Sequence, residues 1–154
     1  MKVNGLLAAP PRARERPIPA VGVAGVLAAV AGGVLVTVSA AVHLRLYALG
    51  YKGLPTVGAL FLAQGVAGAV LGPAVAVLRR PAACLLGAGY MAASIGGFLT
   101  ALWFGLFGFR DGFYAPYAGL AFAVEVAGVV VLVGAAAALW LSWRRREEAG
   151  PVTG

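Results

Sequence analysis

The sequence predicts an all-α protein: a bundle of four transmembrane helices in up-down topology, with both termini in the cytoplasm. Three observations lead to this fold class. The chain is 62% hydrophobic and 11% charged, with a mean hydropathy of +0.93, whereas a soluble domain is typically about 45–50% apolar and about 25% charged. Four apolar stretches are each long enough to cross a hydrocarbon core of about 30 Å. Basic residues gather on one side of these stretches.

The four predicted spans contain no lysine or arginine and cover residues 20–42, 57–78, 82–107 and 117–143. Because the connections between them are short, consecutive helices should be antiparallel neighbours. Residues 43–56 are expected to form an outer turn, and Pro55 is well placed to start the second helix. Gly72 and Pro73 interrupt the second span near its end and should bend it.

Basic residues predict the orientation of the spans. One side of the membrane collects Lys2, Arg12, Arg14, Arg16, Arg79, Arg80, Arg144, Arg145 and Arg146, and the other has Arg45, Lys52 and Arg110. Because positively charged loops stay in the cytoplasm, residues 1–19 and 144–154 are predicted as basic cytoplasmic segments that flank a membrane domain over 20–143. Arginine outnumbers lysine ten to two. This bias is typical of GC-rich bacterial genomes, so the expected location is a bacterial plasma membrane.

The first span also has the features of a secretory signal. Basic residues from Lys2 to Arg16 precede an apolar run, and the small residues "VSA" at 38–40 would suit a cleavage site. The apolar run before that site is about 18 residues long, whereas the apolar region of a signal is usually about 7–15 residues long. We therefore expect the first span to be retained.

Glu125 is the residue that most needs an explanation. It lies about ten residues into the fourth span, which places it about 15 Å deep in the membrane. An ionisable group there costs roughly 2.5–3.5 kcal/mol to insert, so Glu125 should face the bundle and have a polar partner. Gln64 lies about 13 Å deep in the second span. We predict that Glu125 pairs with Gln64 or with a neighbouring hydroxyl.

Polar side chains from all four spans are predicted to form a cluster in the outer half of the bundle. The predicted members are Glu125, Gln64, Thr100, Thr37, Ser39 and His43. Ser39 and His43 are four residues apart and share one helix face, and Ser94 falls near mid-membrane. For Glu125 a structural and a proton-handling role stay open. For Gln64 a helix-bridging role is favoured, and for His43 an interfacial one.

Metal, haem, thiol and nucleic-acid chemistry have little support in the sequence. His43 is the only histidine and Cys84 the only cysteine, whereas metal sites and thiol redox motifs need several such ligands. No serine has a recognisable base beside it, and no Gly-rich loop leads to a lysine. The net charge of +7 arises from residues that flank the spans rather than from a basic patch with interleaved aromatic residues. We expect no catalytic residue, no cofactor, no metal and no nucleic-acid partner.

The stretch "HLRLYALGYKGLPTVGALFLAQ" at 43–64 is followed by "LRRP", by "GGFLTALWFGLFGFRD" and by an acidic residue in the last span. This pattern resembles a group of small, uncharacterised four-span integral membrane proteins of GC-rich bacteria. The resemblance covers roughly residues 40–134, and it implies a topology without an activity. Small multidrug exporters also have four spans and a membrane glutamate, but theirs lies in the first span. Because Glu125 is in the fourth, none of their residues carries over.

Three functions follow, in order of preference. The first is a non-enzymatic accessory or scaffold protein, whose buried polar groups fix the helix pairing and whose partners are the lipid bilayer and a second copy or another membrane protein. The second is a proton-coupled small transporter with Glu125 as the proton carrier. The third is a quinone-binding or redox membrane protein that uses His43, Gln64 and Glu125.

Overall fold

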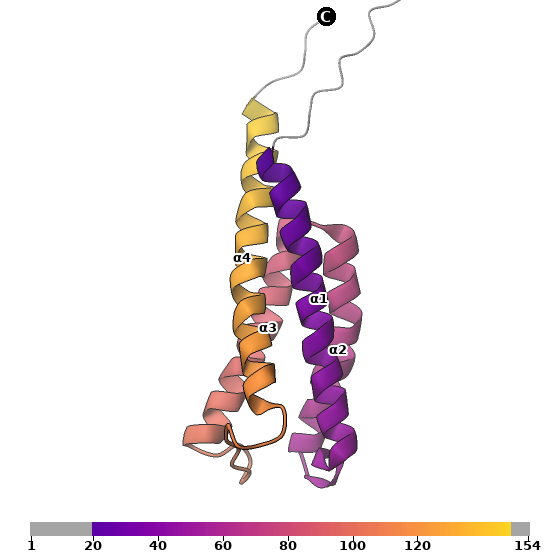
Figure 1. Cartoon of the computed structure of the whole chain (residues 1–154), viewed down its shortest axis with the longest axis vertical. Coiled ribbons are helices and arrows are strands. Elements are labelled where there is room, and N and C mark those ends of the chain that lie inside the picture. Colours follow the sequence, from indigo (N-terminus) through magenta and orange to yellow (C-terminus); the bar gives the residue numbers. More distant parts are fainter. Residues whose placement is uncertain (1–19, 149–154) are drawn as a thin grey trace, which may run out of the picture.

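The computed structural model describes residues 20–148 and contains four long helices (Figure 1). These helices are α1 (Ala20–Leu49), α2 (Val57–Leu78), α3 (Pro81–Trp103) and α4 (Ala118–Glu148), and a short 3-10 helix, η1 (Tyr51–Gly53), follows α1. Within the described residues the only extended pairing is an isolated bridge between Leu106 and Phe109. All four helices are long and apolar enough to cross a membrane. The predicted all-α, multi-pass membrane fold class is confirmed.

Three helix ends differ from those expected by four residues or more, and one of them is the end of α4, which lies at Glu148 instead of 143. Helix α1 continues to Leu49. Residues 43–49, which were predicted to belong to the outer turn, are therefore helical. No glycine or proline interrupts the chain between His43 and Leu49, and leucine, arginine and alanine are good helix formers. Helix α3 ends at Trp103 instead of continuing to 107. Gly105 soon follows with a φ of +84°, a conformation that leaves the helix and that glycine adopts readily.

The start of α1 and the end of α4 lie at the same end of the bundle, as Figure 1 shows. The opposite end, which we call the loop end, carries η1 and the loop between α3 and α4. Helix α1 packs extensively against α2 and α4, and α3 packs against α4, whereas α2 and α3 contact each other much less. The bundle is therefore held mainly through α1 and α4.

Small residues allow the helices to approach closely. A Cβ atom on Gly33 of α1 would lie 2.6 Å from the carbonyl oxygen of Gly72 on α2, so these two backbones are in direct contact. Between α3 and α4, a Cβ on Gly128 would lie 2.7 Å from Cε of Met91. Because lipid tails are as apolar as leucine, such close packing takes the place of water exclusion in holding membrane helices together.

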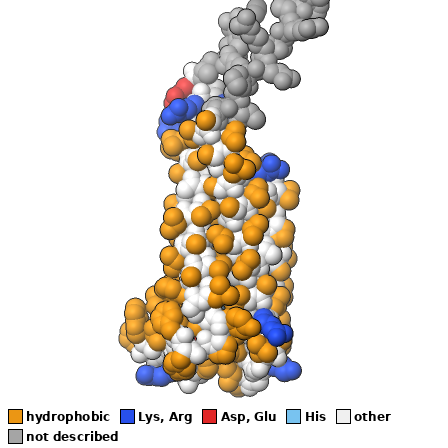
Figure 2. Space-filling model, in the orientation of Figure 1, with side chains coloured by type: hydrophobic (Ala, Val, Ile, Leu, Met, Phe, Trp, Pro, Cys, Tyr) orange, Lys and Arg blue, Asp and Glu red, His pale blue; other side chains and the backbone are white. Residues whose placement is uncertain are grey.

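Hydrophobic side chains cover the flank of the bundle that Figure 2 shows, and lysine and arginine side chains gather near its two ends. Many large apolar residues are exposed on the helices, including Val70 at 70% and Val130 at 68%. A soluble protein rarely exposes apolar patches of this extent. The surface therefore fits a small multi-pass membrane protein.

Candidate functional site

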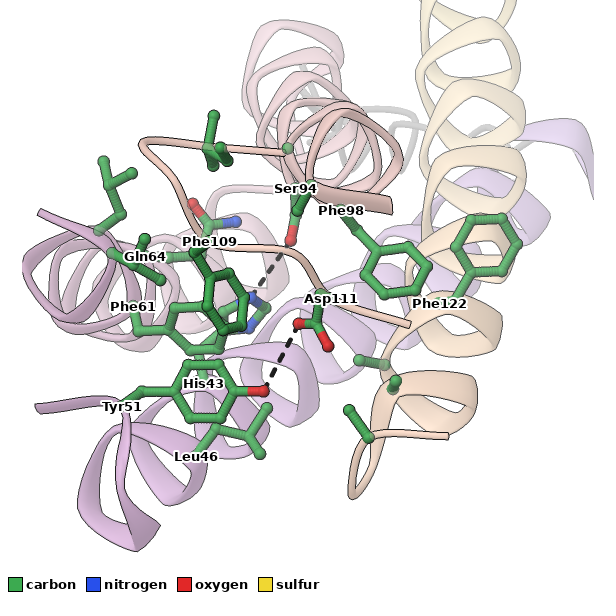
Figure 3. Close-up of a pocket in the computed structure, with 18 of the residues that line it drawn as sticks. His43, Leu46, Tyr51, Phe61, Gln64, Ser94, Phe98, Phe109, Asp111 and Phe122 are labelled. Atoms are coloured by element: carbon green, nitrogen blue, oxygen red, sulfur yellow. Dashed lines mark hydrogen bonds between the residues drawn. The ribbon is translucent and has the colours of Figure 1, made fainter. Parts of the chain in front are cut away.

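A cavity of about 270 Å³ lies between the helices toward the loop end (Figure 3). All four helices, η1 and the α3–α4 loop contribute to its lining, which is mainly apolar. The polar groups that line it come from His43, Gln64, Ser94 and Glu125 within the helices and from Asp111 in the loop. The walls of the cavity are thus mainly apolar, and polar groups lie both at its inner end and, with Tyr51 and Asp111, at its loop end.

Aromatic rings that line the cavity, together with Phe113, which packs on two of them, form two groups. The first joins His43, Tyr51, Phe61 and Phe109, with centroid distances of 4.4–5.6 Å, and the second joins Phe98, Phe113 and Phe122, with centroid distances of 5.0–5.9 Å. Figure 3 shows the labelled members of the two groups on opposite sides of the cavity. These spacings are typical of favourable ring–ring contacts. The two groups therefore form opposite walls that suit a flat, apolar molecule.

Tyr51 and Asp111 meet at the loop end of the cavity. The Tyr51 hydroxyl donates to Oδ2 of Asp111 over a long 3.5 Å, and Oδ1 accepts from the backbone N–H of Gly112 at 2.8 Å. Burial, and next the negative charge of Asp111, raise the pKa of Tyr51 above its ordinary value of 10.0. This contact joins the α1–α2 connection to the α3–α4 loop.

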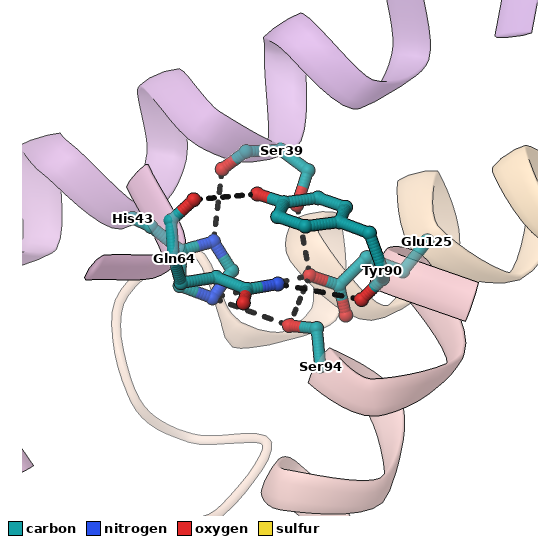
Figure 4. A network of polar contacts seen from close by, with 6 residues as sticks. All are labelled: Ser39, His43, Gln64, Tyr90, Ser94 and Glu125. Atoms are coloured by element: carbon teal, nitrogen blue, oxygen red, sulfur yellow. Dashed lines mark hydrogen bonds and ion pairs between the residues drawn. The ribbon is translucent and has the colours of Figure 1, made fainter. Parts of the chain in front are cut away.

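Glu125 of α4 is buried at the inner end of the cavity, with 2% of its surface exposed. Its Oε1 atom accepts two hydrogen bonds, from Ser39 Oγ of α1 at 2.9 Å and from Ser94 Oγ of α3 at 2.7 Å (Figure 4). A single carboxyl oxygen thus joins three helices. Of the two partners predicted for Glu125, the structure shows the neighbouring hydroxyl.

The imidazole of His43 lies beside this carboxyl. Its Nδ1 atom is 2.9 Å from the backbone carbonyl oxygen of Ser39. A carbonyl only accepts hydrogen bonds, so Nδ1 must carry a proton. The other ring nitrogen, Nε2, lies 3.3 Å from Ser94 Oγ and 4.0 Å from Glu125 Oε1. The Ser94 hydroxyl therefore connects the imidazole to the carboxyl, and His43 is 8% exposed rather than interfacial.

One proton can occupy two positions along His43, Ser94 and Glu125. In the first, a protonated Nε2 donates to Ser94 Oγ while the Ser94 hydroxyl donates to the Glu125 carboxylate. In the second, a protonated Glu125 donates to Ser94 Oγ while the hydroxyl donates to a neutral Nε2. Both arrangements satisfy every bond, and the three side chains together carry no net charge in either, which avoids an unpaired charge in an apolar interior. The arrangement can therefore pass a proton between Glu125 and His43.

Gln64 pairs with Tyr90 and not with Glu125, so the first of the two predicted alternatives does not hold and the hydroxyl alternative does. The Tyr90 hydroxyl donates to the backbone carbonyl of Gln64 at 2.9 Å, and Gln64 Nε2 donates to the backbone carbonyl of Tyr90 at 3.4 Å. This reciprocal pair joins α2 to α3. The amide finds its acceptor on Tyr90, and the Glu125 oxygen already accepts from two hydroxyls.

Thr37 and Thr100 lie outside the polar cluster. Thr37 Oγ1 donates to the carbonyl of Gly33 at 2.9 Å, and Thr100 Oγ1 donates to the carbonyl of Gly96 at 2.7 Å. Each bond stays within its own helix, four residues back along the chain, as threonine hydroxyls commonly bond in helices. Both residues lie at a suitable depth, but on helix faces that point away from Glu125. Their predicted membership of the polar cluster is therefore wrong.

The sequence predictions did not include Ser94, Tyr90 and Asp111 among the site residues. For two of them, the sequence has a feature that could have identified them. Ser94 is at mid-span depth, which placed it near the level of Glu125, and Tyr90 is the only tyrosine in the middle of a predicted span. A buried tyrosine usually bonds its hydroxyl to a partner. Asp111 had no comparable signal, because a charged loop residue beside Arg110 is ordinary.

Across residues 20–148, no group of three or more histidine, cysteine, aspartate or glutamate side chains could hold a metal ion. Comparisons of the chain with protein-family models, with curated proteins and with solved structures gave no match. What the site can do is therefore inferred from its own geometry.

Proposed function

We propose that this small multi-pass membrane protein binds a small molecule in the cavity and couples binding to the movement of a proton between Glu125 and His43. One observation carries the proposal: His43, Ser94 and Glu125 form a hydrogen-bonded chain, and all three also line the cavity. A polar contact that only fixes helix pairing needs no cavity beside it. Here a bound molecule would touch the groups between which the proton moves.

The dimensions of the cavity limit the ligand. Pockets for drug-sized molecules typically measure about 300–1,000 Å³, and this one measures about 270 Å³. The polar groups that its helices contribute lie toward the inner end, close to Glu125 and Ser94. The ligand should therefore be small and largely apolar, with one hydrogen-bonding group directed inward.

Coupling follows from competition for hydrogen bonds. A ligand group that bonds to Ser94 or Glu125 favours one of the two proton positions over the other. Linkage is reciprocal, so the position of the proton then affects the affinity for the ligand by the same factor. Most of the basic residues flank the opposite end of the bundle, and the positive-inside rule favours the cytoplasm for that end, which supports a loop end outside the cell. A site whose ligand binding is linked to the position of a proton suits a proton-coupled small transporter.

A scaffold role is the second candidate. It is favoured by the two hydroxyls, Ser39 on α1 and Ser94 on α3, that meet on the Glu125 oxygen of α4. Such a contact would specify helix pairing in an accessory protein. In that role the proton would stay in one position, and Glu125→Gln would have almost no effect on function.

The single histidine allows a direct test. In protein carrying isotope-labelled histidine, every imidazole nitrogen signal belongs to His43. We expect that phenol or para-nonylphenol, added to the protein in lipid nanodiscs, changes the protonation of Nε2 while Nδ1 stays protonated. In Glu125→Gln the Nε2 signal should no longer respond. If neither compound changes the His43 nitrogen signals of the wild type, the proposal is rejected and the scaffold role is favoured.

A further inference from the structure

We infer that the ligand enters this cavity from the lipid, through a gap between α2 and α3, and that it is a membrane-soluble ring compound with a hydroxyl or carbonyl group and an apolar tail. The inference rests on the proposed ligand-binding function and adds the entry route and the chemical class of the ligand.

The gap appears where two consecutive helices should pack together. Helices joined by a tight turn are usually antiparallel neighbours, yet α2 and α3 contact each other much less than α1 contacts α2 or α3 contacts α4. Leu60 on α2 and Ala93 on α3 both line the cavity, and both are exposed on the surface of the bundle. A helix residue that lines a cavity and is also exposed marks an opening. This opening is in the side of the bundle.

The contact between Tyr51 and Asp111 narrows the route along the bundle axis at the loop end, where Pro116 lines the cavity and is exposed. The ring of Tyr51 packs against Phe109 with centroids 5.6 Å apart, and its hydroxyl meets Asp111 at 3.5 Å. Leu60 and Ala93, in contrast, belong to helices long and apolar enough to cross a membrane. The side opening therefore faces acyl chains, and a ligand that uses it must first dissolve in the bilayer.

The lining indicates a ring with one polar group. The aromatic walls on the two sides of the cavity offer favourable contacts to a flat ring. At the inner end, Ser94, Glu125 and Gln64 supply hydrogen-bond donors and acceptors, which suit a hydroxyl or a carbonyl. A cavity of about 270 Å³ holds a ring and only the first part of a tail, since an apolar cavity of about 150 Å³ already binds benzene. A tail would leave through the gap and lie among the lipids.

Two adjacent glycines of α3 provide a matched pair of variants. Neither Gly96 nor Gly97 has an atom within 4 Å of the position that a Cβ would take, so both tolerate a larger side chain. Only Gly97 lines the cavity. Gly97→Leu therefore fills the space beside the gap, whereas Gly96→Leu adds the same side chain elsewhere on the exposed surface. Both changes remove a helical glycine, so their effects on helix propensity match.

The experiment compares three compounds in nanodiscs by the rise in Tm of the protein: para-nonylphenol with ring and tail, phenol with the ring alone, and nonanol with the tail alone. We expect nonylphenol to stabilise the wild type and Gly96→Leu, and its affinity to fall by about tenfold or more in Gly97→Leu, which corresponds to about 1.4 kcal/mol. Any rise in Tm that nonanol causes should be the same in the wild type, Gly96→Leu and Gly97→Leu. Ala93→Leu, at the edge of the gap, should reproduce the loss if Gly97→Leu folds poorly.

Each other outcome overturns the inference. Equal nonylphenol affinity in Gly96→Leu and Gly97→Leu would remove the gap as the entry route. Phenol binding that Gly97→Leu leaves intact, with nonylphenol binding equally intact, would show that the bound ligand does not occupy the gap, and would leave the proposed function standing. A nonanol effect equal to that of nonylphenol would show partitioning into lipid only. No response to any ring compound, together with an unchanged His43 signal, would reject the proposed function as well.

Discussion

The Nε2 atom of His43 lies 4.0 Å from Oε1 of Glu125, and the hydroxyl of Ser94 bonds to both atoms. A separation of 4.0 Å is too long for a direct hydrogen bond, so a proton that moves between the imidazole and the carboxyl passes through Ser94. The three side chains come from α1, α3 and α4. Helix packing therefore decides whether this path exists.

Ser94→Ala should interrupt the path. It removes one donor to the buried Glu125 carboxyl, and we expect the free energy of unfolding to fall by about 1–3 kcal/mol. His43 Nε2 should then no longer respond to either phenol. Ser39→Ala is the matched control, because it also removes one donor but leaves the Ser39 carbonyl that holds Nδ1. Denaturant titration in micelles and the labelled-histidine spectrum measure both effects. Loss of the response in both variants would contradict the path.

Glu125→Leu should cost far more stability than Glu125→Gln. Leucine leaves the hydroxyls of Ser39 and Ser94 without their buried acceptor, and each unsatisfied buried donor costs about 1–3 kcal/mol. Glutamine keeps an oxygen acceptor, so we expect a loss of less than about 1.5 kcal/mol. Alanine at both serines should recover much of the leucine loss, since removing all partners can be nearly neutral. Equal losses for leucine and glutamine would show that the hydroxyl contacts contribute little.

We expect Tyr51 to lose its proton at a higher pH than an exposed tyrosine does. Its pKa lies above 10.0 in the folded protein because of burial and Asp111, so the fold favours the neutral phenol. The stability that this provides is complete below pH 10.0 and is lost as the pH rises through the folded-state pKa. Phenolate absorbance should therefore show a late component that Tyr51→Phe removes. Asp111→Asn should lower this pKa, though burial keeps it raised. A titration unchanged in Asp111→Asn would contradict the contact.

Gly33→Ala should destabilise the α1–α2 contact. The new Cβ would lie 2.6 Å from the Gly72 carbonyl oxygen and 2.9 Å from the backbone nitrogen of Ala76, neither of which can move alone. Overpacking of this kind typically costs about 1–3 kcal/mol. Gly134→Ala is the control, because no atom lies within 4 Å of its Cβ position. It should raise stability by up to about 1 kcal/mol through helix propensity. Tm values in one detergent compare the two.

The orientation of the bundle is open to labelling with cysteine reagents. Cys84 is fully buried, so it gives a low background. Gly53→Cys lies in η1 at the loop end, where no atom crowds the new side chain. The positive-inside rule predicts that an impermeant maleimide labels it on intact cells. Glu148→Cys, at the end of α4, should react only after the cells are permeabilised. The reverse pattern would place the loop end inside.

The sequence by itself determined the four spans, the all-α class and the depth of Glu125. These follow from hydropathy and helical rise, which are properties of a local segment, because a membrane leaves the backbone few alternatives to the helix. The end of α1 does not follow from hydropathy. The polar residues at 43–49 mark where the chain can leave the apolar part of the membrane, but the helix continues through them to Leu49.

Only the tertiary structure decided which polar side chains meet. Depth gives the level of a residue, whereas the rotation of each helix about its axis decides which neighbour the residue faces. Thr37 has a suitable level and bonds within its own helix, and Gln64 faces Tyr90. Ser94 instead faces both His43 and Glu125. These rotations are set by close contacts between small residues of different helices, and composition alone does not say which contacts form.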